Sequence, residues 1–258
     1  MIQTSSQPVA PASALRLQSV SRRFGGVEAV RDVTLDIAYG ERRVILGPNG
    51  AGKSTLFNLV AGEFKPSTGT IVLFDKDVTG LSTQYRARHG LTRTYQTTHL
   101  FNGLSTLDNL FLAVRGIKPK RMSMLRPRAN DHYLAKAREI AAQVGLKAVL
   151  ERKVGALSHG EQRQLELGMA LAGEPRMIIL DEPAAGLSQG ERAHLTELIL
   201  GLDPTITVLL IEHGMDVALQ IAQVVTVMHN GRVIVNGTPA EIRGNALVHE
   251  LYLGEHHE

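Results

Sequence analysis

The segment 47–55, Gly-Pro-Asn-Gly-Ala-Gly-Lys-Ser-Thr, constrains this chain more than any other stretch of its sequence. Its spacing of Gly, four residues and Gly-Lys-Ser is that of a phosphate-binding P-loop. The apolar run 44–46 predicts a buried strand before it, and residues 56–61 after it contain no helix breaker. A glycine-rich turn before a structural helix is the alternative, but the pattern should arise by chance in on the order of one chain in a hundred of this length.

A P-loop binds phosphate through its backbone. Its glycines let successive N–H groups point inward, and the helix that follows adds its positive N-terminal end. Lys53 would then reach the outer phosphates of a nucleotide, and Ser54 would bind Mg²⁺. The predicted nucleotide-binding residues of this segment are Gly47, Pro48, Asn49, Gly50, Ala51, Gly52, Lys53, Ser54 and Thr55.

Composition limits the kinds of protein that remain. The chain has 258 residues, enough for one large domain or a domain with a subdomain. It has no cysteine, which excludes disulfides and thiolate metal sites, and its formal charge of +3 does not by itself suggest nucleic acid. No uncharged apolar stretch approaches the roughly 20 residues that cross a bilayer. Residues 1–14, rich in Ser, Gln, Pro and Ala, predict a flexible leader without the features of a signal peptide.

The remaining sequence alternates between predicted strands and helices, which indicates an α/β fold. Short strands that suit an antiparallel region near the N-terminus are predicted at 16–20, 33–37 and 71–74. Apolar residues at helical spacing predict helices over 104–114 and 132–150, with a basic loop between them. The short runs 177–180 and 206–211 are apolar except for Thr207 and predict buried parallel strands.

Two acids follow the first of these buried runs. Asp181 and Glu182 would lie at the carboxyl edge of the sheet, where α/β folds bind ligands. Asp181 there would hold Mg²⁺, and Glu182 would polarise an attacking water as a general base. A strand that ends in solvated acids is the alternative, but the P-loop upstream makes it the weaker interpretation.

The segment 157–162, Leu-Ser-His-Gly-Glu-Gln, has the form of a helix start. Ser158 and Glu161 form a capping-box pattern, and an ordinary capped helix would explain them completely. Gly160 does not fit that explanation, because a glycine in a helix costs roughly 1 kcal/mol relative to alanine. Its presence makes sense if another group approaches the backbone closely. A second phosphate-binding helix end is explained if it serves a nucleotide held by another copy of the chain.

These segments, in this order and spacing, resemble those of an ABC transporter ATPase. The matching elements are 47–55 (Walker A), 157–162 (signature), 178–182 (Walker B) and His213 (switch histidine), and the resemblance covers about residues 14–254. The signature is the specific part, because other P-loop classes lack it. The stretches that look most like the ATPases of branched-chain amino-acid importers are 92–96, 181–187, 210–213, 236–239 and 252–255. The ATPases of lipopolysaccharide export and urea import are similar too.

The resemblance implies roles for further residues. Phe24 would stack on adenine, although a core position is its alternative. Gln96 would contact Mg²⁺ and the attacking water, and His213 would sense the terminal phosphate. The catalytic residues would then be Glu182, His213 and Gln96, the metal ligands Ser54, Gln96 and Asp181, and the additional nucleotide contacts Phe24, Ser158 and Gly160. One departure is Ser188, where many family members carry Asp in the loop that communicates between two copies.

The same resemblance implies an α/β P-loop core with an N-terminal antiparallel β region and an α-helical subdomain. The expected boundaries are an ATPase domain at 15–254, its helical subdomain at 95–154, and a tail at 255–258. The implied activity is hydrolysis of ATP with Mg²⁺, coupled to transport through separate transmembrane permease subunits. Branched-chain amino acids or related small polar solutes would be imported.

The partners implied are the permeases, a second ATPase subunit in a head-to-tail homodimer or heterodimer, and indirectly a substrate-binding protein, with no nucleic acid. The implied location is peripheral, at the cytoplasmic face of the inner (plasma) membrane. Leu100 and Phe101 follow Gln96 in a predicted loop, and an exposed apolar pair there would suit a groove that grips a permease helix. The basic run between 118 and 128 could lie near anionic lipid or form a solvated loop.

Three alternatives stay open. The ATPase could serve lipopolysaccharide export or urea import. It could be a non-transport ABC ATPase, but those usually carry two ATPase units or a long coiled-coil insert. It could be an unrelated P-loop enzyme such as a GTPase, but the sequence has no Asn/Thr-Lys-x-Asp motif to read guanine.

Overall fold

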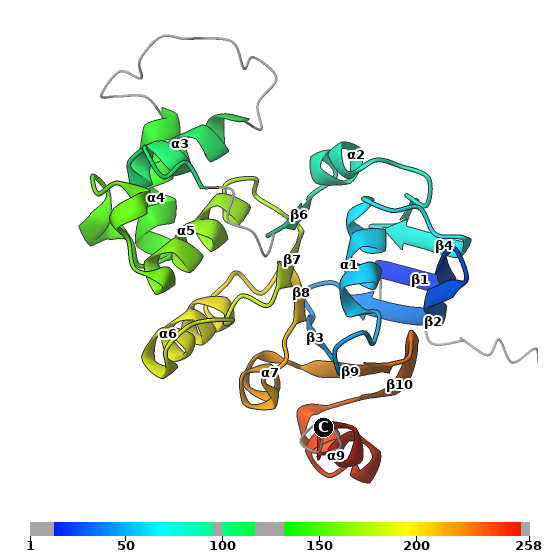
Figure 1. Ribbon diagram of the computed structural model, residues 1–258. Coiled ribbons are helices and arrows are strands. Elements are labelled where there is room, and N and C mark those ends of the chain that lie inside the picture. The colour runs from blue at the N-terminus through cyan, green and yellow to red at the C-terminus, as the bar shows by residue number, and fades with distance from the viewer. Residues whose placement is uncertain (1–12, 95–99, 117–131, 254–258) are drawn as a thin grey trace, which may run out of the picture.

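The protein contains two β-sheets, seen in a computed structural model that describes residues 13–94, 100–116 and 132–253 (Figure 1). The smaller sheet is antiparallel and has the strand order β2-β1-β4-β5. Its strands are β1 (Ser13–Phe24), β2 (Val27–Ala38), β4 (Thr68–Leu73) and β5 (Lys76–Asp77). The antiparallel region predicted near the N-terminus is therefore confirmed, and its first two strands are longer than the sequence indicated.

The larger sheet has the order β10-β9-β3-β8-β7-β6, and all its neighbouring strands are parallel except the edge strand β10. The strands are β3 (Arg42–Leu46), β6 (Leu91–Arg93), β7 (Met177–Asp181), β8 (Thr207–Ile211), β9 (Val224–His229) and β10 (Arg232–Gly237). Strands β7 and β8 are buried at every position, as the apolar runs within them predicted.

Side chains that alternate along the parallel strands fill two separate cores. Ile45 points into the core shared with the antiparallel sheet, whereas Val44 and Leu46 point into the core shared with most of the helices. The helix between the two sheets is α1 (Lys53–Ala61), and α2 (Thr83–Arg88) follows it. The larger sheet thus has a covered face on each side, which is the layered α/β arrangement expected from the sequence.

A group of helices lies away from the antiparallel sheet, shown in green in Figure 1. It contains α3 (Thr106–Gly116), α4 (His132–Gln143) and α5 (His159–Leu171), which pack on one another. The predicted helix over 132–150 is wrong at its end. The backbone N–H of Leu146 bonds to the carbonyl of Ala141 and closes α4, and a 3₁₀ turn, η1 (Lys147–Val149), follows. A second 3₁₀ turn, η2 (Val154–Ala156), leads into α5.

The remaining helices contribute buried side chains to the core that also includes Val44 and Leu46. They are α6 (Gln189–Leu200), α7 (Met215–Ile221), α8 (Pro239–Arg243) and α9 (Ala246–Leu253). Within the described ranges, no helix is both long and apolar enough to cross a membrane. The predicted basic loop and Gln96 fall largely or wholly outside the described residues.

Candidate nucleotide-binding site

The phosphate loop runs from the end of β3 to the first residue of α1, as its motif predicted. Gly52 caps the helix with a φ of 97°, and a Cβ at this position would lie 2.3 Å from the carbonyl oxygen of Ala29. Only glycine fits a backbone held so closely against β2. On the other side, the N–H of Gly231 bonds to the carbonyl of Ala51 at 3.0 Å. The loop is therefore fixed between two hairpins before any ligand is considered.

Lys53 lies folded inside this loop. Its side chain is buried, and its Nζ donates hydrogen bonds to the carbonyl oxygens of Gly47 at 2.5 Å and Pro48 at 2.9 Å. The two carbonyl oxygens hold the positive charge of Lys53 inside the loop, where it can attract an anionic ligand.

Residues from four parts of the chain line the pocket at the loop. They are Ala29, Asn49, Gly50, Ala51, Gly52, Lys53, Ser54, Thr55, Glu182 and His213. The structure thus brings together the predicted loop residues, the predicted general base and the predicted phosphate sensor. Gly47 and Pro48 do not line this pocket, but their carbonyl oxygens accept the hydrogen bonds from Lys53.

Glu182 and His213 are in direct contact in this pocket. Oε1 of Glu182 lies 2.6 Å from Nε2 of His213. Strands β7 and β8 are neighbours in register, with Asp181 opposite Ile211, so the residues after the two strands emerge side by side. Glu182 has a φ of 49°, an uncommon conformation for a residue with a side chain, and such strain occurs often at functional sites.

Asp181 is the buried acid of the pair. Its Oδ2 accepts a hydrogen bond from Nη2 of Arg93 at 2.9 Å, and its buried Oδ1 has no hydrogen-bond partner among the described residues. Burial raises the pKa of the Asp181 carboxyl, and the bond from Arg93 opposes that shift. An unpartnered buried carboxylate oxygen is costly to leave alone, so it marks a place for a ligand.

The donors present fit Mg²⁺. This ion prefers oxygen ligands and is usually bound by one or two protein groups together with substrate phosphates. Asp181 Oδ1 and the exposed hydroxyl of Ser54 are such groups. The described residues contain no cluster of three His, Cys, Asp or Glu that would hold a metal by themselves. Gln96, the third predicted ligand, lies outside the described residues.

Phe24 is the last residue of β1, in the hairpin that β1 and β2 form, and it is 40% exposed, so it is not a core residue. Its ring meets Phe64 edge-on at 5.4 Å, and the guanidinium of Arg22 lies 4.6 Å from its centre. Phe24 does not line the loop pocket itself. An exposed and laterally supported ring is available for stacking on a base.

Ser158 and Gly160 lie elsewhere, at the N-terminus of α5. Ser158 and Glu161 form the predicted capping box. The close approach expected at Gly160 is also present: its N–H donates to Oε1 of Glu191 at 3.0 Å, and a Cβ would lie 2.7 Å from that oxygen. Neither residue lines the phosphate-loop pocket of its own chain.

Glu191 was not singled out from the sequence, although a signal was available. Ser188 and Glu191 repeat the Ser-x-x-Glu pattern of Ser158 and Glu161, and they form a second capping box at the start of α6. Hydrogen bonds from the Ser188 side chain and backbone, with a further one from Gly160, lower the pKa of Glu191. One carboxylate therefore joins the first turns of two helices.

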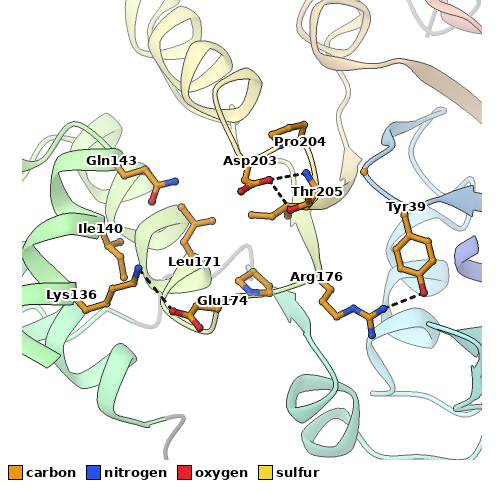
Figure 2. A pocket seen from close by; sticks show the side chains of 13 residues that line it. Tyr39, Lys136, Ile140, Gln143, Leu171, Glu174, Arg176, Asp203, Pro204 and Thr205 are labelled. Carbon is orange, nitrogen blue, oxygen red and sulfur yellow. Dashed lines mark hydrogen bonds and ion pairs between the residues drawn. The ribbon is translucent and has the colours of Figure 1, made fainter. Parts of the chain in front are cut away.

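A larger hollow of about 770 Å³ lies at the opposite, amino ends of β7 and β8 (Figure 2). None of the predicted site residues lines it. Lys136 lies 3.9 Å from Glu174, Arg176 donates to the Tyr39 hydroxyl at 3.1 Å, and Asp203 accepts two hydrogen bonds from Thr205. Its charged groups thus bond to protein partners.

A fixed phosphate loop, two consecutive acids at the end of β7, and a histidine after β8 define a P-loop nucleotide hydrolase. The capped start of α5, held apart from that pocket, is the segment that resembles the signature of ATP-binding cassettes.

Comparisons with known proteins agree. The family model described as "ABC transporter" matches residues 30–185. The model described as "Branched-chain amino acid ATP-binding cassette transporter" matches residues 232–258. The chain belongs to the ABC transporter family, and it is the kind of subunit that binds and hydrolyses ATP.

Individual relatives cover nearly the whole chain. The high-affinity branched-chain amino acid transport ATP-binding protein LivG of Escherichia coli K12 is 38% identical over 97% of this chain and 99% of its own length. The lipopolysaccharide export system ATP-binding protein LptB of Acidithiobacillus ferridurans is 35% identical over 93% and 97%. The ADP conformation of MJ1267, an ATP-binding cassette of an ABC transporter, has a TM-score of 0.84 and 30% identity over 94% of this chain and 99% of its own.

Proposed function

We propose that this chain hydrolyses Mg²⁺–ATP to power import of branched-chain amino acids or related small polar solutes through separate permease subunits. The observation that carries the hydrolytic part is the 2.6 Å contact between Glu182 and His213 on the wall of the phosphate-loop pocket. The similarity to LivG over nearly the full chain supports branched-chain amino acids as the transported substrate.

The pocket's own residues suit the individual steps. The N–H groups of the loop and Nζ of Lys53 would bind the outer phosphates and hold them in place. Ser54, Asp181 and Gln96 would hold Mg²⁺, which when bound neutralises charge that develops on the phosphates. Glu182 would accept a proton from the attacking water, and His213 would hold the Glu182 carboxylate and sense the terminal phosphate. Phe24 would stack on adenine.

A second copy of the chain, or a similar subunit, would complete each site. Ser158 and Gly160 do not line the phosphate-loop pocket of their own chain, so their role in nucleotide binding requires a partner. A head-to-tail dimer would bring the first turn of α5 of one subunit to the nucleotide of the other. Two sites would then form at one interface.

The permeases would bind near Phe101. This residue is 54% exposed, whereas its neighbour Leu100 packs partly against the helical core. The buried Asn109 side chain fixes the Phe101 backbone through two hydrogen bonds, one at 2.9 Å and one at 3.2 Å. An apolar side chain on a fixed loop suits a permease helix, and such docking would place the subunit at the cytoplasmic membrane face.

Lipopolysaccharide export is the second candidate, because LptB is also similar over 93% of the chain. Purification of the tagged chain from its native membrane, followed by identification of the bound membrane subunits, separates the two. Amino-acid permeases with a periplasmic binding protein are expected. Lipopolysaccharide-export permeases in their place would overturn the import proposal and leave the ATPase assignment intact.

A further inference from the structure

Arg93 stands next to the pocket without lining it. It is the last residue of β6, the edge strand of the parallel sheet, and lies opposite Ile179 of β7. Its side chain is only 9% exposed. A buried arginine needs hydrogen-bond partners for its donors, and the identity of these partners tells what the residue holds.

The two ends of the Arg93 guanidinium reach two different elements. Nη1 donates to Oδ1 of Asn58 at 2.5 Å and to Oε1 of Glu63 at 3.1 Å, on and just after α1. Nη2 donates to Oδ2 of Asp181 at 2.9 Å, at the end of β7. A single rigid, planar group thus spans the helix that begins at the phosphate loop and the strand that ends in the acidic pair.

This geometry fixes which oxygen of Asp181 remains available. Since Arg93 occupies Oδ2, the carboxylate cannot rotate freely, and Oδ1 is left without a hydrogen bond among the described residues. The bonds to Asn58 and Glu63 fix the guanidinium in turn. The orientation of Asp181 is therefore set relative to α1 and its phosphate loop rather than relative to β7 alone.

We propose that Arg93 is a positioning residue for the metal–nucleotide site: it orients Asp181 so that Oδ1 faces Mg²⁺, and it couples that orientation to α1. This inference rests on the proposed function of Asp181. Nothing in it requires Arg93 to touch nucleotide or metal.

A purely structural role is the competing explanation. Arg93 could simply hold α1 against the sheet through Asn58 and Glu63. Its loss would then disturb the phosphate loop and weaken nucleotide binding whether Mg²⁺ is present or absent. A positioning role predicts that only the Mg²⁺-dependent part of nucleotide binding is weakened. The two explanations therefore differ in a measurable way.

The test uses a fluorescent ATP analogue, titrated onto the purified full chain in EDTA and over a range of Mg²⁺ concentrations. Arg93→Lys keeps the charge but replaces the fork with a single point donor, which cannot span both elements. Arg93→Gln serves as the second variant if the lysine variant does not fold. Glu63→Gln is the matched control, because it removes the charge at the other end of the network while its amide oxygen can still accept the hydrogen bond from Arg93, and Asp181 is not touched. Asp181→Asn and the double variant Asp181→Asn/Arg93→Lys complete a double-mutant cycle.

Arg93→Lys is expected to bind the analogue in EDTA about as tightly as wild type but to need about ten-fold more Mg²⁺ for half-maximal enhancement. Glu63→Gln should keep the wild-type Mg²⁺ midpoint. In the Asp181→Asn background, Arg93→Lys should cause little further shift, because residues that act through one another are not additive.

Equal weakening in EDTA and in Mg²⁺, or fully additive shifts in the double variant, would overturn the positioning role. Wild-type protein that binds the analogue in neither buffer would instead overturn the proposed nucleotide site, and this inference with it.

Discussion

Nε2 of His213 lies 2.6 Å from Oε1 of Glu182, where two neighbouring parallel strands end. The contact joins residues 31 positions apart in the sequence. It follows from the register of β7 and β8, because Asp181 pairs with Ile211 and the next residues of each strand leave the sheet on the same edge. The proposed base and its partner are thus set by sheet geometry and not by a flexible loop.

Glu182→Gln tests this pair. The amide keeps the size of the side chain but cannot accept the proton of water, so ATP should bind without turnover. If two subunits close on the nucleotide, the variant should elute as a dimer in size-exclusion chromatography with ATP and as a monomer without it. A monomer at saturating ATP would count against the two-subunit site.

Lys53→Ala should abolish nucleotide binding or hydrolysis. The ammonium group is the only side-chain cation that lines the described pocket, apart from the histidine, and the outer phosphates would otherwise face backbone donors alone. ATPase assays and equilibrium binding measure the effect, with Lys76→Ala, at an exposed position in β5, as the control. Near-normal hydrolysis by the Lys53 variant would contradict the assignment of the phosphate loop.

Phe24→Ala should weaken ATP binding by about ten-fold, because a base that stacks on an aromatic ring gains about 1–3 kcal/mol. Val27→Ala is a matched control, since Val27 is exposed and pairs with Phe24 across the same hairpin. Isothermal titration of both variants with ATP and with inorganic triphosphate separates loss of base stacking from damage to the hairpin. The loss should be absent with triphosphate.

Glu191→Ala should lower the melting temperature more than Glu241→Ala. Both glutamates complete capping boxes, but only Glu191 also accepts the N–H of Gly160 on another helix. Ser188 holds the pKa of Glu191 below its usual range, so its contribution to stability is present above the normal pKa and is lost as the pH falls through the lowered one. Thermal unfolding at neutral and acidic pH should therefore show a difference that shrinks in acid. Equal losses at neutral pH would show that the link to α5 contributes nothing.

Phe101→Ala should leave ATPase of the isolated chain within about a factor of three and weaken permease binding, because truncating a buried interface aromatic commonly costs about 2 kcal/mol or more. Leu247→Ala, an exposed apolar residue in α9, is the control. Pull-down with the native permeases measures binding. Unchanged capture would refute the docking role, and an equal loss of ATPase in the isolated chain would make Phe101 a structural residue.

The sequence predicted the parts of the site that depend on local spacing and strand order. The phosphate loop follows one buried strand, and Asp181 and Glu182 stand at the end of another, so strand order placed them at one edge of the sheet. His213 follows the buried strand β8, but it was singled out through the resemblance to ABC transporter ATPases. Arg93 could not be found in this way. Its strand has three residues, too few to show a period, and its partners Asn58, Glu63 and Asp181 come from distant segments.

The contact of Gly160 with Glu191 was predicted only in part. The misplaced glycine indicated that some group approaches the helix start, but not which one, because that depends on how α5 and α6 pack. The predicted end of the helix that begins at residue 132 was wrong for a related reason. Apolar spacing continues past Gln143, whereas the hydrogen bonds of residues 145 and 146 back to the last turn decide where the helix stops.

The place of β3 within its sheet has a consequence for how the protein is made. This strand leads into the phosphate loop, yet its two sheet neighbours are β8 and β9, which come more than 150 residues later in the chain. During synthesis on the ribosome, the loop therefore emerges long before the strands that hold it exist. Long-range pairing of this kind forms late in folding. A nascent chain that stops before β9 should not retain nucleotide, however complete its phosphate-binding motif.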